Sequence, residues 1–121
     1  MLQFSTERLR DLAREALRRC HGAYHCDTVS NEFLVILETY DGVKELPSAR
    51  RAPFNGANHF VATVPTEIVE NYEERNWVVV DPTIRQFEDK IEDSQLLDGE
   101  VAVLPPSDPR RKDWYDSVSG I

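Results

Sequence analysis

The sequence predicts an α+β fold, because two segments with helical periodicity come first and three segments rich in β-forming residues follow them. A chain of 121 residues with 40% hydrophobic content can enclose one core and is too short for two ordinary domains. We therefore expect a single domain over residues 1–105. Residues 106–121 have no periodic pattern, so we expect an irregular tail that only Trp114 and Tyr115 could dock.

The first expected helix covers residues 5–20, "STERLRDLAREALRRC". Ser5 or Thr6 is a candidate N-cap, and Gly22 stands where helices commonly stop. Five Arg against three acidic residues give the first 20 residues a net charge of +2. The apolar face of this amphipathic helix consists of Leu9, Leu12, Ala13, Ala16 and Leu17.

The second expected helix lies in "CDTVSNEFLVILETYDG" and ends at Gly42. Its middle is apolar almost all round, because Leu34 and Val35 stand between the residues of the main apolar face, which predicts a buried helix. That face consists of Val29, Phe33, Ile36, Leu37 and Tyr40. The possible capping residues Asp27, Thr28 and Ser30 put Cys26 at or just before the N-terminus of this helix.

The second half of the chain predicts a small antiparallel sheet. A loop is expected over residues 43–57, and strands are expected over residues 58–65, 76–83 and 99–106. Polar and acidic segments join these strands. The second strand, within "NWVVVDPT", ends at an aspartate followed by Pro82, which cannot donate to a β-ladder.

The formal net charge of −8 is concentrated in one part of the chain, since residues 66–100 hold eleven acidic and three basic side chains. Phosphate binding needs clustered Lys and Arg, so this pattern argues against a nucleic-acid partner. A basic protein partner is compatible with it, although a solvated acidic surface is the commoner reason for such a run.

The sequence contains no segment typical of membrane insertion or of a cleaved signal. No stretch approaches the roughly 20 apolar residues that cross a bilayer, and the charged N-terminal segment lacks the apolar region of a signal peptide. We therefore expect a soluble protein that is made in the cytoplasm and has no membrane partner. Two cysteines are too few for a disulfide scaffold, so we expect reduced thiols.

The strands at 58–65 and 76–83 place an imidazole beside a carboxylate. If they pair about a connection centred near residue 70, the numbers of paired residues sum to about 140, and Asp81 lies opposite His59. Side chains alternate along a strand, so Trp77 shares this face. Asp81 could then orient His59 as the third member of a catalytic triad does.

Cys26 is the best candidate nucleophile for this pair. The unpaired N–H groups at a helix N-terminus stabilise a thiolate and could also hold the oxyanion of a tetrahedral intermediate. Cys20, at the other end of a helix, is expected to be a small packing residue.

The order Cys26, His59, Asp81, with "NHFVATV" before "WVVVDPT", resembles the core of the transglutaminase-like, papain-like superfamily. The continuation "DPTIRQF" is similar to small papain-fold domains of bacterial toxins and effectors. The resemblance implies a Cys-His-Asp triad, with the nucleophile at the start of a helix packed on an antiparallel sheet. It spans about residues 24–104.

The implied activity is thiol-dependent acyl transfer on protein carboxamides, either glutamine deamidation or transglutamination, with peptide cleavage as the alternative reaction of this fold. No cofactor or metal is expected. The implied partners are a protein substrate and an inhibitor or immunity protein, and a toxin or effector would be exported without a cleavable signal. Weaker candidates for substrate or oxyanion contacts are His25, Trp77 and Gln86, although a core position is the commoner explanation for Trp77 and a solvated loop position for Gln86.

Two other interpretations remain open. The segment "CHGAYHC" offers four zinc ligand types in seven residues, but structural zinc sites normally take two spaced pairs from separate arms, which so short a loop hardly allows. The second is a non-catalytic module of the same fold that binds a basic partner through its acidic surface.

Overall fold

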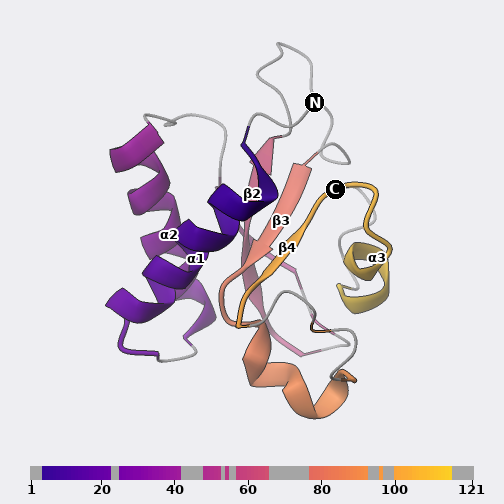
Figure 1. Cartoon of the computed structure of the whole chain (residues 1–121). Helices are drawn as coiled ribbons and strands as arrows, with labels where there is room; N and C mark the ends of the chain where they lie inside the picture. Colours follow the sequence, from indigo (N-terminus) through magenta and orange to yellow (C-terminus); the bar gives the residue numbers. More distant parts are fainter. Residues whose placement is uncertain are drawn as a thin grey trace.

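The protein folds as an α+β structure in which two helices pack on one face of an antiparallel sheet (Figure 1). The opposite face is covered by shorter elements from the second half of the chain. The computed structural model describes residues 4–22, 25–41, 48–52, 54, 57–65, 77–92, 96 and 100–115.

Helix α1 (Thr6–Arg19) forms where its pattern predicts it. The side chain of Ser5 caps it by accepting a hydrogen bond from the Arg8 N–H at 3.0 Å. The chain leaves the helix through a left-handed turn, with φ of 57° at His21 and 72° at Gly22, and the Gly22 N–H donates to the Leu17 carbonyl at 2.9 Å. The five expected apolar residues are all buried.

Helix α2 (Cys26–Asp41) begins at the cysteine itself. Val29, Phe33, Ile36 and Leu37 are completely buried, as expected. The expectation that the helix is buried on all sides is wrong, because Val35 is 52% exposed. The sheet covers only one side of α2 and α1 a second, so the outward side stays open to solvent.

The sheet has four strands in the order β1-β2-β3-β4, and every neighbouring pair is antiparallel. The three expected strands are present in shorter form, and a fourth occupies part of the segment expected to be a loop. The strands are β1 (Ser48–Arg51), β2 (Phe60–Pro65), β3 (Trp77–Asp81) and β4 (Ala102–Leu104). The sequence "SARR" of β1 has no hydrophobic alternation, so only its pairing with β2 reveals it as a strand.

Alternation along the strands divides the apolar residues into two cores. Even-numbered residues of β2 and β3, such as Ala62 and Val80, pack against α1 and α2. Odd-numbered residues, such as Val61 and Val79, face the other way. They meet an aromatic layer that includes Phe54, Phe87, Trp114 and Tyr115.

This second layer is built by η2 (Ile84–Lys90), a 3₁₀ segment, and α3 (Arg110–Trp114), a short helix. The expected irregular tail is therefore wrong over residues 110–114. Trp114 and Tyr115 dock this segment, because both are buried in the second core. None of the helices in the described part of the chain has the length and apolar character that a bilayer crossing requires.

Candidate active site

His59 and Asp81 form a buried hydrogen-bonded pair at one end of the sheet. The Nε2 atom of His59 lies 2.7 Å from Oδ2 of Asp81, and neither side chain is exposed to solvent. His59 immediately precedes β2, and Asp81 is the last residue of β3. The expected meeting of imidazole and carboxylate on one face of the sheet is thus confirmed.

The expected register differs from the observed one by two residues. Ala62 pairs with Val80 and Pro65 with Trp77, so paired numbers sum to 142 (62 + 80, 65 + 77) and not to about 140. His59 is therefore diagonal to Asp81 and not directly opposite it. A shift of two residues preserves the face of every side chain, which is why the pair still forms.

The Asp81 carboxylate receives hydrogen bonds from three residues. Oδ1 accepts from the Thr83 N–H at 3.1 Å and from Thr83 Oγ1 at 3.4 Å, an Asx turn that Pro82 helps to shape. Oδ2 accepts from the Tyr115 hydroxyl at 2.5 Å as well as from His59. These donors balance much of the cost of burying a carboxylate.

The second imidazole nitrogen of His59 meets Gln86. The Nε2 amide nitrogen of Gln86 lies 3.1 Å from Nδ1 of His59 and 3.0 Å from Oγ1 of Thr83. An amide nitrogen only donates, so Nδ1 is the acceptor and Nε2 carries the imidazole proton. Gln86 is thus a site residue and not a solvated loop residue.

These contacts close a ring of hydrogen bonds. Gln86 donates to His59 and to Thr83, and each of those two donates in turn to Asp81. Every polar atom in the ring has a partner, as a buried network requires. The ring fixes one tautomer of His59, with its lone pair on Nδ1 directed at Gln86.

Aromatic side chains pack around His59 and exclude water from its hydrogen bonds. The rings of Phe87 and His59 lie perpendicular to each other with centroids 4.8 Å apart, and Phe54 stacks on Phe87 at 4.4 Å. The ring of Tyr115 lies nearly parallel to that of His59 at 6.2 Å. The low local dielectric that results strengthens the hydrogen bonds of the pair.

Cys26 lies at the same end of the fold, on the helical side of the sheet. It is partly exposed, its thiol is free, and it is the first residue of α2. The Ser30 hydroxyl donates to the carbonyl of Phe60 at 3.5 Å, which ties the start of α2 to the residue after His59. Figure 1 shows α2 and β2 running in the same direction from this end.

Cys26 and His59 each lie a few residues before the Ser30–Phe60 hydrogen bond, on opposite faces of the sheet. Cys26 precedes Ser30 by four residues, about 6 Å along a helix axis, and His59 precedes Phe60 by about 3.3 Å. In the described part of the chain, however, no hydrogen bond joins the Cys26 thiol to His59 or Asp81. The structure therefore brings His59, Asp81 and Gln86 together in the second core, whereas Cys26 begins α2 on the opposite face of the sheet, without contact to them.

The two remaining site candidates lie away from this ring. His25 is an exposed residue whose carbonyl accepts from the Val29 N–H at 2.9 Å, so it stands at the start of α2. Trp77 is 3% exposed and begins β3, four residues or about 13 Å from Asp81. Trp77 is a core residue, which removes its expected alternative role as a substrate platform.

Sequence reasoning missed two members of the site. The contact of Thr83 could have been predicted from the local sequence. An Asp side chain commonly accepts from the backbone N–H two residues later in an Asx turn, and Pro82 favours such a turn. The contact of Tyr115 has no signal in the local sequence, since Tyr115 lies 34 residues after Asp81 and reaches it only through the fold. Burial raises the pKa of Tyr115 well above its usual value, and the neighbouring Asp81 carboxylate raises it further.

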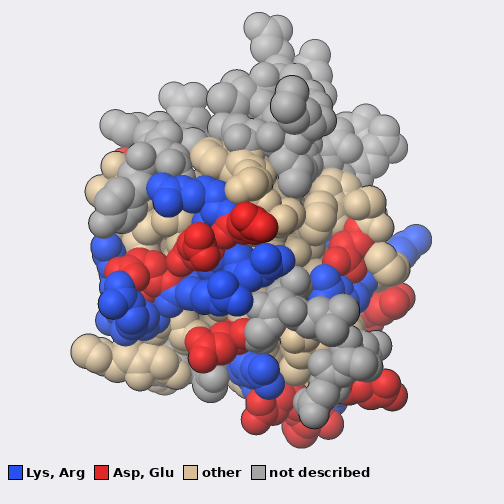
Figure 2. Space-filling model, in the orientation of Figure 1, with Lys and Arg blue, Asp and Glu red and all other residues tan. Residues whose placement is uncertain are grey.

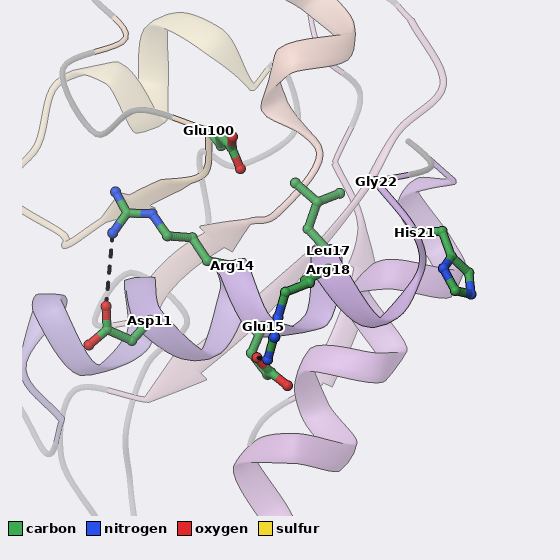
Figure 3. Close-up of a pocket in the computed structure, with 8 residues that line it drawn as sticks. All are labelled: Asp11, Arg14, Glu15, Leu17, Arg18, His21, Gly22 and Glu100. Atoms are coloured by element: carbon green, nitrogen blue, oxygen red, sulfur yellow. Dashed lines mark hydrogen bonds and ion pairs between the residues drawn. The ribbon is translucent and has the colours of Figure 1, made fainter.

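The charged surface of the molecule lies outside this site. Figure 2 shows acidic and basic side chains interleaved over α1, where Arg14 pairs with Asp11 and Arg18 with Glu15. A hollow of about 590 Å³ next to α1 is lined by these four residues together with Glu100 and others, and contains none of the site residues (Figure 3). Much of the acidic segment 66–100 lies outside the described residues.

The segment considered for zinc does not form a metal-binding cluster. Cys20, His21, His25 and Cys26 are all described, and no group of three or more potential ligands occurs in the described ranges. Comparisons of the chain with protein-family models, with curated proteins and with solved structures found no match.

Proposed function

We propose that the protein is a cysteine-dependent acyl-transfer enzyme that acts on carboxamide groups of proteins, by deamidation or transglutamination. The observation that supports this function best is the tautomer of His59. Nε2 of His59 donates its proton in a hydrogen bond to Asp81, so the basic lone pair of the imidazole is on Nδ1, at the end of the sheet from which α2 and β2 start.

In the proposed reaction, Nδ1 of His59 accepts the proton of the Cys26 thiol. The thiolate attacks the carbonyl carbon of the carboxamide, and N–H groups at the start of α2 stabilise the oxyanion. The tetrahedral intermediate expels ammonia, which takes the proton from Nδ1, and a thioester remains on Cys26. Attack by water gives a carboxylic acid, whereas attack by a primary amine gives a new amide, and either restores the thiol.

The proposed reaction requires Gln86 to leave Nδ1, because a sulfur and an amide nitrogen cannot occupy the same position. Gln86 belongs to η2, which departs from helical geometry at Phe87 (φ −109°, ψ 18°). Its side chain is only partly buried, and the proposed reaction requires it to turn toward solvent and Cys26 to reach Nδ1 around the end of the sheet. The structure corresponds in this proposal to a resting state of the enzyme.

A blocked glutamine dipeptide, supplied with and without hydroxylamine, tests this function. We expect ammonia release in both reactions and formation of a hydroxamate when hydroxylamine is present. Cys26→Ala should abolish both products, whereas Cys20→Ala should retain them. Cleavage of the dipeptide bond without ammonia release would instead identify a peptidase. If no product depends on Cys26, the proposal is wrong.

The toxin or effector role is tested separately from the chemistry. Expression of the wild-type chain in bacteria should inhibit growth, and Cys26→Ala should relieve the inhibition. Equal toxicity of the two forms would remove a thiol-dependent toxin role. Growth inhibition by neither form would remove the toxin role in that host.

A second candidate function is a non-catalytic binding module, and one observation favours it. His59 is completely buried and both of its ring nitrogens have partners, which is what a structural histidine requires. In this alternative the ring of hydrogen bonds only anchors η2 and α3 to the sheet. The dipeptide reaction distinguishes the two functions, since the module would release no ammonia.

A further inference from the structure

Tyr115 and His59 hydrogen-bond the same oxygen atom of Asp81. The Tyr115 hydroxyl lies 2.5 Å from Oδ2, and Nε2 of His59 lies 2.7 Å from it. All three side chains are buried, with at most 1% of the Tyr115 side chain exposed. The Tyr115 hydroxyl therefore helps to set the direction in which the Asp81 carboxylate points.

Tyr115 can only act as a donor to Asp81 in this position. Burial, and then the charge of the Asp81 carboxylate, raise the pKa of Tyr115 well above that of an exposed tyrosine, so the hydroxyl keeps its proton. Hydrogen bonds between a hydroxyl and a carboxylate are short and strong. Thr83 donates to Oδ1 of the same carboxylate, so the hydrogen bonds of Tyr115 and Thr83 fix the orientation in which Oδ2 faces His59.

We propose that Tyr115 is a positioning residue of the site: its hydroxyl donates to Oδ2 of Asp81 and directs that oxygen at His59, which keeps the imidazole proton on Nε2 and the lone pair on Nδ1. The catalytic consequence rests on the proposed function. The effect on the imidazole itself does not, because it follows from the hydrogen bonds alone.

The C-terminal part of the fold holds Tyr115 at this place. The Tyr115 N–H donates to the Arg111 carbonyl at 3.3 Å, and the ring edge packs on Phe54 with centroids 5.5 Å apart. Trp114 is buried next to it, with the Arg110 guanidinium 5.4 Å from its ring. Segment 110–115 therefore delivers one hydroxyl to a site whose other members lie between residues 59 and 86.

Proton NMR of the Cys26→Ala protein tests the inference without any contribution from catalysis. We expect a deshielded, slowly exchanging Nε2 proton on His59 and a hydroxyl proton on Tyr115, with a nuclear Overhauser contact between the two. In Tyr115→Phe the His59 proton should move further downfield, because Oδ2 then accepts from one donor fewer and its bond to His59 shortens. Trp114→Phe, a nearby packing change without a hydroxyl, should leave the resonance in place.

The result of each experiment either supports or overturns the role of Tyr115. An unchanged His59 resonance in Tyr115→Phe would overturn the inference. If Tyr115→Phe does not fold, the unsubstituted tyrosine decides, since absence of the hydroxyl-to-imidazole contact would overturn it equally. With Cys26 restored, Tyr115→Phe should lower kcat for the glutamine dipeptide about tenfold with little change in KM. If ammonia release never occurs while the NMR result holds, the proposed function fails and the positioning role of Tyr115 stands.

Discussion

Gln86 donates its amide nitrogen to Nδ1 of His59 at 3.1 Å and so occupies the imidazole atom that a cysteine nucleophile would need. The same amide nitrogen also donates to Thr83, so a single side chain closes the ring of hydrogen bonds around Asp81. In the proposed mechanism, the resting state has the contact between Gln86 and His59, and the reactive state lacks it. If the proposed function holds, the strength of this hydrogen bond limits how often Nδ1 is free to meet Cys26.

Gln86→Ala should increase the reactivity of Cys26. Loss of one hydrogen bond, worth about 0.5–1.5 kcal/mol, corresponds to roughly a 2- to 13-fold rise in the fraction of molecules with a free Nδ1. The rate of alkylation of Cys26 by iodoacetamide near neutral pH measures it. Glu88→Ala, an exposed change in the same 3₁₀ segment, is the control and should leave the rate unaltered. A slower reaction in Gln86→Ala would show that Gln86 assists the thiol and does not block it.

Asp81→Ala should destabilise the fold strongly. The substitution removes the acceptor of four buried donors, namely the Tyr115 hydroxyl, the His59 N–H and the N–H and hydroxyl of Thr83, at a cost on the order of 3–5 kcal/mol. Chemical denaturation measures the change in the free energy of unfolding. Asp89→Ala removes an exposed carboxylate from η2 and should change it by no more than about 0.5 kcal/mol. Similar small losses in both variants would mean that Asp81 is not the acceptor of this network.

The two cysteines should differ in reactivity. Burial, and then the Glu32 carboxylate, raise the pKa of the Cys20 thiol, so little thiolate forms there at neutral pH. Cys26 is a partly exposed free cysteine at the first position of α2. Mass spectrometry after brief alkylation should find Cys26 modified first in the wild type. Preferential modification of Cys20 would contradict this assignment.

Alkaline conditions should destabilise the protein through Tyr115. The pKa of this hydroxyl is higher in the folded state than in the unfolded chain, where it is about 10, so above that pH the unfolded state gives up a proton that the folded state retains. The contribution is complete below about pH 10 and falls by up to roughly 1.4 kcal/mol for each further pH unit. Denaturation at about pH 9 and about pH 11 measures the fall, which should be smaller in Tyr115→Phe. Equal pH dependence in the two proteins would show that Tyr115 ionises freely in the fold.

The helices and the central strands could be predicted because their signals are local. The buried positions of α1 follow a helical period, and β2 and β3 are continuous runs of β-forming residues. The pairing of His59 with Asp81 could be predicted because side chains alternate along a strand. A register that is wrong by an even number of residues still places both side chains on the same face of the sheet. An error of two residues in that register left the pairing intact.

The parts that could not be predicted depend on contacts between distant segments. Strand β1 has a polar sequence and exists through its pairing with β2, and α3 is a five-residue helix too short to form alone. Tyr115 reaches Asp81 only after α3 has packed on the second core. Val35 stands among apolar residues in the sequence but is exposed in the fold. A sequence pattern does not reveal how much of a helix the neighbouring elements cover.

The proposed function requires Cys26 to act together with the His59–Asp81 pair. The alkylation rate of Cys26 at low pH tests this requirement most directly. We predict that Cys26 in the wild type reacts with iodoacetamide at about pH 6 well above the rate of an ordinary thiol, and that His59→Gln removes this excess. A Cys26 that reacts at the rate of an ordinary thiol at that pH, and is indifferent to His59→Gln, would contradict the account.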